Sequence, residues 1–141
     1  MNCEHQVGTF TTRALTEADR ADWERLFRAY IAFYEASVAD EVIDRTFRAL
    51  LSSDPGTHSG FAAVGADDRP VGIAHLLFHP STWSPTGYAY LEDLYVDPAV
   101  RGVGIGELLI RCVFAEADRL GATRTYWTTQ EFNQRARGLY D

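Results

Sequence analysis

Apolar residues recur at three- and four-residue steps in the first part of the chain, which is the spacing that places side chains on one stripe of a helix. The stripe contains Trp23, Leu26, Phe27, Tyr30, Ile31 and Tyr34. Thr16 and Asp19 precede it at capping-box spacing, so we predict a helix from there to about Glu35. A second amphipathic stretch predicts a helix from Asp40 to Leu51, which ends before Asp54-Pro55-Gly56.

The middle of the chain has the pattern of strands. Val7 to Arg13 form a first short candidate strand. Gly60 to Gly65 and Val71 to Phe78 flank a turn at Asp67-Asp68-Arg69-Pro70, which predicts an antiparallel hairpin. Tyr88 to Val96 follow as a third long strand.

The last third of the chain alternates helix and strand. A glycine cluster at Arg101 to Gly106 leads into a helix from about Gly104 to Leu120. Thr123 to Thr129 are strand-like, and Phe132 to Tyr140 have helical character. No internal repeat or linker divides the 141 residues, so we predict one domain over 1–141, of the α+β class with a mixed sheet.

Charge and cysteine usage narrow the function classes. The formal net charge is −7 and the 13 Lys plus Arg residues, all of them Arg, are scattered, which argues against a nucleic-acid partner and favours cationic substrates, although such acidity also serves solubility alone. No signal core or membrane-length apolar run is present, so we expect no membrane partner and a cytoplasmic location.

Cys3 and Cys112 lack metal-ligand spacing and fit a reducing compartment, so we expect free thiols. His75 and His79 share one strand face without a third ligand, and we predict no metal site.

The glycine cluster is a candidate anion site. Gly102, Gly104 and Gly106 stand between a predicted strand and a predicted helix, where backbone N–H groups and the positive helix end can hold a pyrophosphate. Arg101 at the entrance could add a charge-assisted contact. A Walker A loop is excluded because no Gly-Lys-Ser/Thr follows, and the dinucleotide fingerprint fails because Glu107 replaces its third glycine.

The run Arg101-Gly102-Val103-Gly104-Ile105-Gly106 resembles the coenzyme A signature of the GNAT acetyltransferase superfamily, Arg/Gln-x-x-Gly-x-Gly/Ala. The stretch from Tyr90 to Pro98 resembles the strand and turn that precede this signature. Asn133, Ala136, Leu139 and Tyr140 are similar to the late Asn-x-x-Ala-x-x-Leu-Tyr helix. The predicted element order also matches, so the resemblance implies the GNAT acyl-CoA N-acyltransferase fold and an acetyl-CoA-dependent N-acetyltransferase.

Within the superfamily, the sequence Leu-Glu-Asp-Leu-Tyr-Val resembles the corresponding segment of spermidine/spermine (diamine) and histone/polyamine acetyltransferase-like members. This implies a small cationic amine as acceptor and a homodimer. Family members continue with two further strands after the Leu-Tyr helix, whereas this sequence ends at Asp141. We therefore expect a C-terminally incomplete domain: a fragment, a tail that is not observed, or strands supplied by a partner.

Acetyl transfer to an amine requires a base, because an alkyl amine with a pKa near 10.4 is neutral in only about one molecule in 10³ at pH 7. Glu92 and Asp93 alternate faces on a strand unless a bulge intervenes, and the resemblance implies a bulge here. It also implies Glu92 as the base, through a bound water, and Asp93 as the carboxylate that orients the cation; the opposite assignment stays open. Alternatively, Glu92 caps or pairs with a basic residue such as Arg69.

The resemblance also implies roles on the cofactor side. A backbone N–H near Leu94 or Tyr95 would polarise the thioester, and the pantetheine arm would lie beside Leu94, Tyr95 and Val96 like an added strand. Asn133 would hold a pantetheine amide, or cap its helix. Tyr140 would protonate the departing sulfur, or be a core or surface residue.

Tyr30 and Tyr34 could line the amine pocket with their ring faces, or only pack the helix into the core. Two other functions remain open at this point. The chain could acetylate protein lysines, or it could be a non-catalytic acyl-CoA sensor, for which loss of the carboxylates would be the expected mark.

Overall fold

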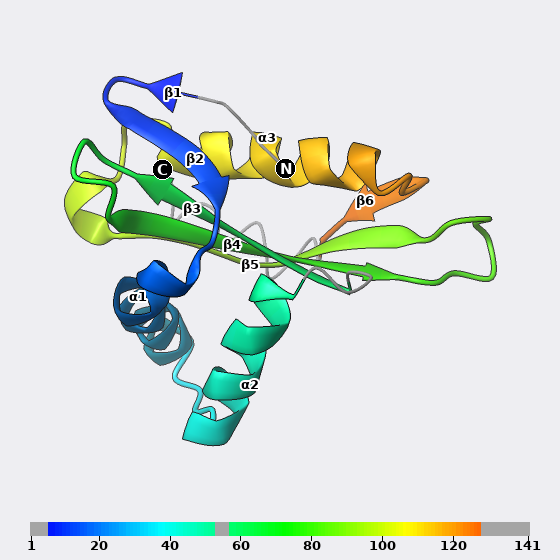
Figure 1. Ribbon diagram of the computed structural model, residues 1–141, viewed down its shortest axis with the longest axis horizontal. Coiled ribbons are helices and arrows are strands. Elements are labelled where there is room, and N and C mark those ends of the chain that lie inside the picture. Colours follow the sequence, from blue (N-terminus) through cyan, green and yellow to red (C-terminus); the bar gives the residue numbers. More distant parts are fainter. Residues whose placement is uncertain (1–5, 53–56, 128–141) are drawn as a thin grey trace.

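The computed structural model describes residues 6–52 and 57–127, and the statements below concern those residues. They form one six-stranded sheet in the order β1-β2-β3-β4-β5-β6. One long helix, α3, covers one face of the sheet, and α1 and α2 cover the other (Figure 1). The predicted α+β class with a mixed sheet is therefore confirmed.

The strands are β1 (Gln6–Val7), β2 (Phe10–Ala14), β3 (His58–Val64), β4 (Pro70–His79), β5 (Tyr88–Val96) and β6 (Arg124–Tyr126). The helices are α1 (Arg20–Phe33), α2 (Asp40–Leu51) and α3 (Ile105–Arg119), with 3₁₀ turns η1 (Glu17–Asp19) and η2 (Pro98–Val100). Strands β1 to β5 pair antiparallel in sequence, whereas β6 runs parallel to β5. The predicted long helices and strands lie where the periodicity placed them.

The N-terminal strand is the main departure from the predicted elements. The segment expected as one strand from Val7 to Arg13 is a hairpin of β1 and β2. Gly8 sits at the turn with φ of 58°, a conformation that glycine adopts without the steric cost of a Cβ. A turn glycine inside a short apolar run is the signal that the strand prediction passed over.

An ion pair fixes the start of α1. Arg13 donates two hydrogen bonds to the carboxylate of Asp19, at 2.7 and 2.9 Å. The backbone N–H of Thr16 donates to the same carboxylate at 2.8 Å, as the predicted capping box requires. Burial alone would raise the pKa of Asp19, but the hydrogen bonds from Arg13 and Thr16 outweigh it and hold the pKa below its usual range.

Two apolar layers enclose the sheet. We call the first the α3-side core; its buried members are Phe61, Ala63, Ala74, Leu76, Ala89, Leu91, Leu94, Val96, Ile105, Leu109, Cys112, Val113 and Ala117. We call the second the α1/α2-side core; its buried members are Leu15, Trp23, Leu26, Phe27, Tyr30, Ile43, Phe47, Leu50, Ala62, Val64, Ile73 and Tyr95. The first is mostly aliphatic and the second contains most of the buried aromatic rings.

Cys112 corrects one expectation from composition. It is buried in the α3-side core and is disulfide-bonded, so the expectation of a free thiol there was wrong. None of the described helices combines the length and the apolar character that crossing a bilayer requires.

Candidate active site

A β-bulge interrupts the pairing of β4 with β5. His75 pairs with Asp93, but the next residue of β4, Leu76, pairs with Leu91. Glu92 is therefore an extra residue in β5, opposite no residue of its own on β4. This places a bulge at the pair of carboxylates, where the family resemblance implied one.

The bulge changes which side chains face α1 and α2. In a regular strand successive side chains alternate faces. Before the bulge the odd-numbered residues of β5, Ala89 and Leu91, lie in the α3-side core, whereas after it the even-numbered Leu94 and Val96 do. The alternation of side chains along β5 therefore shifts by one residue at Glu92. As a result, both Glu92 and Asp93 lie on the α1/α2 face.

A pocket of about 360 Å³ opens on this face. Its walls come from α1, the segment after it, the start of α2 and the bulged part of β5. The lining residues are Phe27, Tyr30, Ile31, Tyr34, Ala36, Val38, Val42, Tyr90, Glu92 and Asp93. We call it the acidic pocket, because two adjacent carboxylates line a wall that otherwise consists of aromatic and aliphatic side chains.

Tyr30 and Tyr34 line the acidic pocket and also pack against neighbouring aromatic rings. Their rings meet edge to face at a centroid separation of 5.2 Å, and Tyr30 meets Tyr95 in the same way at 6.1 Å. The Tyr30 hydroxyl lies 3.5 Å from the carbonyl oxygen of Glu92, at the long limit of a hydrogen bond. Pocket lining and core packing, set out as alternatives from the sequence, are therefore compatible.

Asp93 belongs to a chain of hydrogen bonds that the sequence analysis missed. Its Oδ2 lies 2.8 Å from Nδ1 of His75, and the indole N–H of Trp23 donates to Nε2 of the same imidazole at 2.9 Å. His75 was considered only as half of a metal pair, and Trp23 only as part of the core stripe. Placing the bulge would have set His75 opposite Asp93, but the contact with Trp23 depends on the packing of α1 against the sheet.

The two histidines of β4 have separate environments. His79 contacts the Tyr126 hydroxyl at 2.7 Å and the carbonyl oxygen of Pro80 at 2.8 Å, away from the acidic pocket. In the described part of the chain, no three His, Cys, Asp or Glu side chains gather as a set that could hold a metal ion.

The alternative partner considered for Glu92 is engaged elsewhere. Arg69 donates to both carboxylate oxygens of Asp22, at 3.1 and 3.0 Å. Arg69 is thus paired with Asp22, while the wider alternative, that Glu92 caps or pairs with a basic residue, stays a prediction. Glu92 is the exposed member of the carboxylate pair, whereas Asp93 is half-buried.

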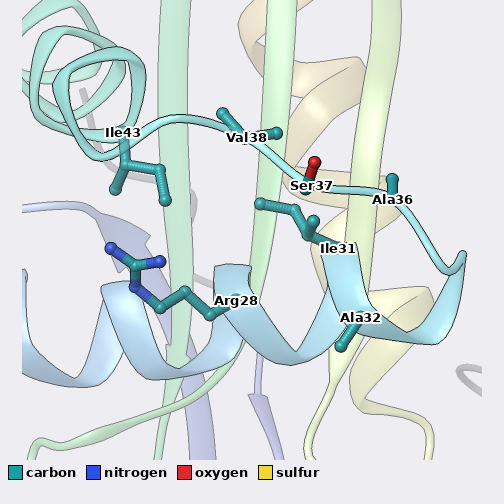
Figure 2. A pocket seen from close by; sticks show the side chains of 7 residues that line it. All are labelled: Arg28, Ile31, Ala32, Ala36, Ser37, Val38 and Ile43. Atoms are coloured by element: carbon teal, nitrogen blue, oxygen red, sulfur yellow. The ribbon is translucent and has the colours of Figure 1, made fainter.

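A second, smaller hollow adjoins the acidic pocket. It measures about 220 Å³ and shares Ile31, Ala36 and Val38 with it. Figure 2 shows Arg28 reaching from α1 toward Ile43, beneath the segment that carries Ser37. The Arg28 guanidinium donates to Glu24 and Asp40, each at 2.8 Å, so its charge is already balanced by two carboxylates.

The glycine cluster forms the start of α3, as predicted. Gly102 and Gly104 have φ of 85° and 88°, and Gly104 is the N-cap of the helix. The N–H groups of a first helical turn have no carbonyl one turn earlier, and here they join the positive end of the helix dipole. Neither glycine carries a side chain that would cover these groups, so the loop fits a phosphate group.

The other residues of the glycine cluster differ in their contacts and in their burial; they are Arg101, Val103, Ile105 and Gly106. The Arg101 guanidinium lies 5.4 Å from the Tyr95 ring centroid and donates to the carbonyl oxygen of Val96 at 3.0 Å, so it ties the loop to the end of β5. Val103 is exposed, whereas Ile105 and Gly106 are buried against the core.

The two last strands of the sheet pair over a short length only. β6 pairs with Tyr88 to Tyr90, and this ladder does not reach Leu94, Tyr95 and Val96. In the described part of the chain, the end of β5 after the bulge, Leu94 to Val96, therefore has no strand on its outer side as it approaches the glycine loop. Asn133 and Tyr140, the other two residues implied by the resemblance, lie outside the described residues.

A helix start that fits a phosphate group, at one end of a bulged strand, and an acidic pocket at the bulge are compatible with transfer of an acyl group to an amine. Comparison with known proteins gives the family. Residues 23–141 match the sequence profile of the Acetyltransferase (GNAT) family, and the chain belongs to that family. It is an N-acetyltransferase, and the family uses acetyl-CoA.

Two curated relatives illustrate the similarity in sequence. The D-amino-acid N-acetyltransferase HPA3 of Saccharomyces cerevisiae is 31% identical over 128 residues, covering 91% of this chain and 80% of its own length. Thialysine N-epsilon-acetyltransferase of Bos taurus is 33% identical over 135 residues, covering 91% of this chain and 79% of its own.

Solved structures share the fold at lower identity. An aminoglycoside acetyltransferase from an uncultured soil metagenomic sample, in complex with trehalose, has a TM-score of 0.72 at 21% identity, covering 92% of this chain and 84% of its own. Aminoglycoside N-acetyltransferase AAC(6')-Iy in complex with CoA has a TM-score of 0.75 at 17% identity, covering 95% and 85%. These likenesses show the GNAT fold.

Proposed function

We propose that this enzyme moves an acetyl group from acetyl-CoA to a primary amine of a small cationic acceptor of the diamine or polyamine kind, by direct attack of the amine. The observation that carries the proposal is the bulge at Glu92, which sets two adjacent carboxylates on one face of an aromatic pocket. A protonated amine needs both a counter-charge and a proton acceptor, and the pocket offers one carboxylate for each.

The acidic pocket would divide these tasks. Glu92, the exposed carboxylate, accepts the ammonium proton directly or through water. Asp93 attracts and orients the cation, and the faces of Tyr30 and Tyr34 add a favourable environment for positive charge. The adjoining hollow gives room for the far end of the acceptor.

The cofactor side rests on the loop and the end of β5. Acetyl-CoA, when bound, supplies the acetyl thioester. The backbone N–H groups of Arg101 to Gly106 hold its diphosphate, and the main chain of Leu94 to Val96 holds the pantetheine arm. Asn133 as a pantetheine contact, Tyr140 as general acid, a homodimer and a cytoplasmic location stay predictions from the family resemblance.

The relatives leave the acceptor open within one chemical class. Their names give D-amino acids, thialysine and aminoglycosides as acceptors, which share an amine nitrogen. The acidic pocket and the net charge of −7 favour an acceptor with more than one positive charge. Acetylation of protein lysines, or acyl-CoA sensing without turnover, are the competing outcomes of the test below.

The first experiment measures binding and then turnover. Acetyl-CoA is titrated calorimetrically, and thiol release is then followed with diamines, polyamines, D-amino acids, aminoglycosides and a lysine peptide. We expect binding, and the highest kcat/KM with a diamine or polyamine. Binding without turnover on any amine would indicate a sensor, and turnover on the peptide alone would indicate a protein acetyltransferase.

The second experiment tests the role of Glu92. Glu92→Gln should lower kcat by about 10²-fold to 10³-fold and alter its pH dependence, because the proton acceptor is lost. Acetyl-CoA affinity should stay within about twofold. Glu41→Gln, at an exposed position of α2, is the matched control. Loss of cofactor affinity in Glu92→Gln would contradict this assignment.

A further inference from the structure

Three side chains from three different elements form a continuous hydrogen-bonded chain that ends in the acidic pocket. Trp23 comes from α1, His75 from β4 and Asp93 from β5. The indole nitrogen lies 2.9 Å from Nε2 of His75, and Nδ1 of His75 lies 2.8 Å from Oδ2 of Asp93. Trp23 is 0% exposed and His75 is 2% exposed, whereas the Asp93 side chain, at 16%, reaches the pocket.

The donors in this chain determine the imidazole tautomer. An indole N–H can only donate, so Nε2 of His75 must accept and carries no proton. The ring proton then sits on Nδ1, which donates to the carboxylate of Asp93. A second proton on Nε2 would face the indole N–H at 2.9 Å and break that bond.

Aromatic rings surround the imidazole of His75, so both of its nitrogens need hydrogen-bond partners. Its ring packs against Phe27 edge to face at 5.1 Å and against Trp23 at 5.9 Å. A buried imidazole among aromatic rings is costly unless both nitrogens have partners, and here both do. An apolar residue would fill the same space, so packing alone does not account for a histidine at this position.

We infer that His75 is a positioning residue for acetyl transfer: as the Nδ1-protonated tautomer set by Trp23, it holds the Asp93 carboxylate in the orientation that aims it at the acceptor amine. The inference rests on the proposed function and deepens it. It also separates the two carboxylates. Asp93 already accepts an N–H bond from His75, which leaves the proton transfer to the exposed Glu92.

The tautomer can be tested without any activity. Nitrogen-15 spectra of the His75 ring in the whole protein should show a protonated Nδ1 and an unprotonated Nε2. In Trp23→Phe, which keeps an aromatic ring but removes the indole donor, the same ring should shift toward a mixture of tautomers. An Nε2-protonated ring in the unaltered protein would overturn the inference, whatever the enzyme acetylates.

Kinetics then test the positioning role. His75→Asn keeps an amide N–H at roughly the place of Nδ1, whereas His75→Leu removes the donor. We expect His75→Leu to lower kcat/KM for the amine by about tenfold to hundredfold, chiefly through KM, with acetyl-CoA affinity unchanged. His75→Asn should restore most of this loss. A purely structural role predicts instead that both variants lose stability and activity together.

A double-mutant cycle completes the test. Asp93→Asn should lower kcat/KM for the amine by a similar factor, and adding His75→Leu should lower it by less than about twofold more, because the two residues act as one unit. Additive effects would overturn the inference. If the unaltered enzyme turns over amines and His75→Leu equals it, the inference fails while the proposed function stands. If no amine is turned over, the proposed function itself fails.

Discussion

The two faces of the sheet are built from the same strands but from different kinds of side chain. The α3-side core consists mainly of Leu, Val, Ile and Ala, which need no hydrogen-bond partners. The α1/α2-side core contains Trp23, Phe27, Tyr30, Phe47 and Tyr95. On this second face the core continues without a break into the acidic pocket, since Phe27 and Tyr30 belong to both.

The difference shows how one sheet can serve stability and chemistry at once. On the α3 side, β5 presents aliphatic residues both before and after the bulge, namely Ala89, Leu91, Leu94 and Val96. On the other side, the bulge at Glu92 brings two carboxylates and a buried histidine to a single region. Changes in the α3-side core away from the end of β5 and the glycine loop should therefore affect folding alone, whereas changes near the bulge should affect the reaction.

Truncation in the aliphatic layer should give the largest effect on stability. Leu109 is fully buried on α3, so Leu109→Ala should lower the free energy of unfolding by about 3 kcal/mol through lost burial and the remaining cavity. Urea denaturation measures this. At temperatures where the variant is folded, kcat/KM for the amine should change by less than about twofold.

The matched variant on the other face is His75→Leu, which replaces a buried polar side chain with an apolar one of similar size. It should change kcat/KM for the amine far more than Leu109→Ala does. If Leu109→Ala alters the kinetics as strongly as His75→Leu, the division of labour between the two faces is wrong.

A pH-dependent effect should follow from the ion pair at the start of α1. Asp19→Asn should lower the free energy of unfolding at pH 7 by about 2 kcal/mol, less than for a fully buried pair, because Arg13 is partly exposed. The folded-state pKa of Asp19 is depressed, so its contribution is present above the unfolded pKa, near 3.9. It is lost as the pH falls below that value through the folded pKa.

Unfolding free energies measured from pH 7 down to pH 2 test this linkage. The difference between the unaltered protein and Asp19→Asn should be largest near neutral pH and should shrink below about pH 4. A difference that grows on acidification would contradict the depressed pKa.

Sequence patterns predicted most of the fold because the signals were local. The stripe from Trp23 to Tyr34 and the run from Tyr88 to Val96 have the periods of a helix and a strand, and the structure has those elements there. The glycine cluster marked the start of α3 for the same reason. The hairpin at Gly8 was missed because one glycine in a short apolar run is a weak signal.

The site was less accessible to sequence reasoning because it depends on register. Glu92 and Asp93 were identified, but their shared face follows from a bulge that periodicity does not encode. The link from Trp23 through His75 to Asp93 joins residues 52 and 18 positions apart. Such contacts arise only when three elements are packed together.

The start of α3 should give a smaller effect on stability that is coupled to the cofactor. Gly104 has φ of 88°, and a Cβ there would approach Val7 no closer than 3.9 Å, so Gly104→Ala adds backbone strain without a clash. We expect a loss of about 1 kcal/mol in the free energy of unfolding. Acetyl-CoA affinity should fall by about tenfold or more, since relaxing the strain moves the loop N–H groups.

Gly121 provides the matched control at the other end of the same helix. It has φ of 77°, and a Cβ there would lie 3.6 Å from Thr86, an ordinary contact. Gly121→Ala should therefore cost about the same stability as Gly104→Ala while acetyl-CoA affinity stays within about twofold. Equal losses of affinity in both variants would show that strain in α3, rather than the loop, controls binding.

The smallest effect is expected on the solvent side of α3, outside both cores. Arg111 donates to Glu107 at 3.1 Å, but their side chains are 60% and 67% exposed, so water and salt screen the pair. Arg111→Ala should change the free energy of unfolding by less than about 0.5 kcal/mol, and 1 M salt should remove the difference. Glu107 lies in the first turn of α3, so Arg111→Ala also leaves a negative charge unbalanced near the glycine loop. If acetyl-CoA affinity falls clearly at low salt and recovers at high salt, charges along α3 contribute to cofactor binding. If the affinity is unchanged, binding depends on the glycine loop alone.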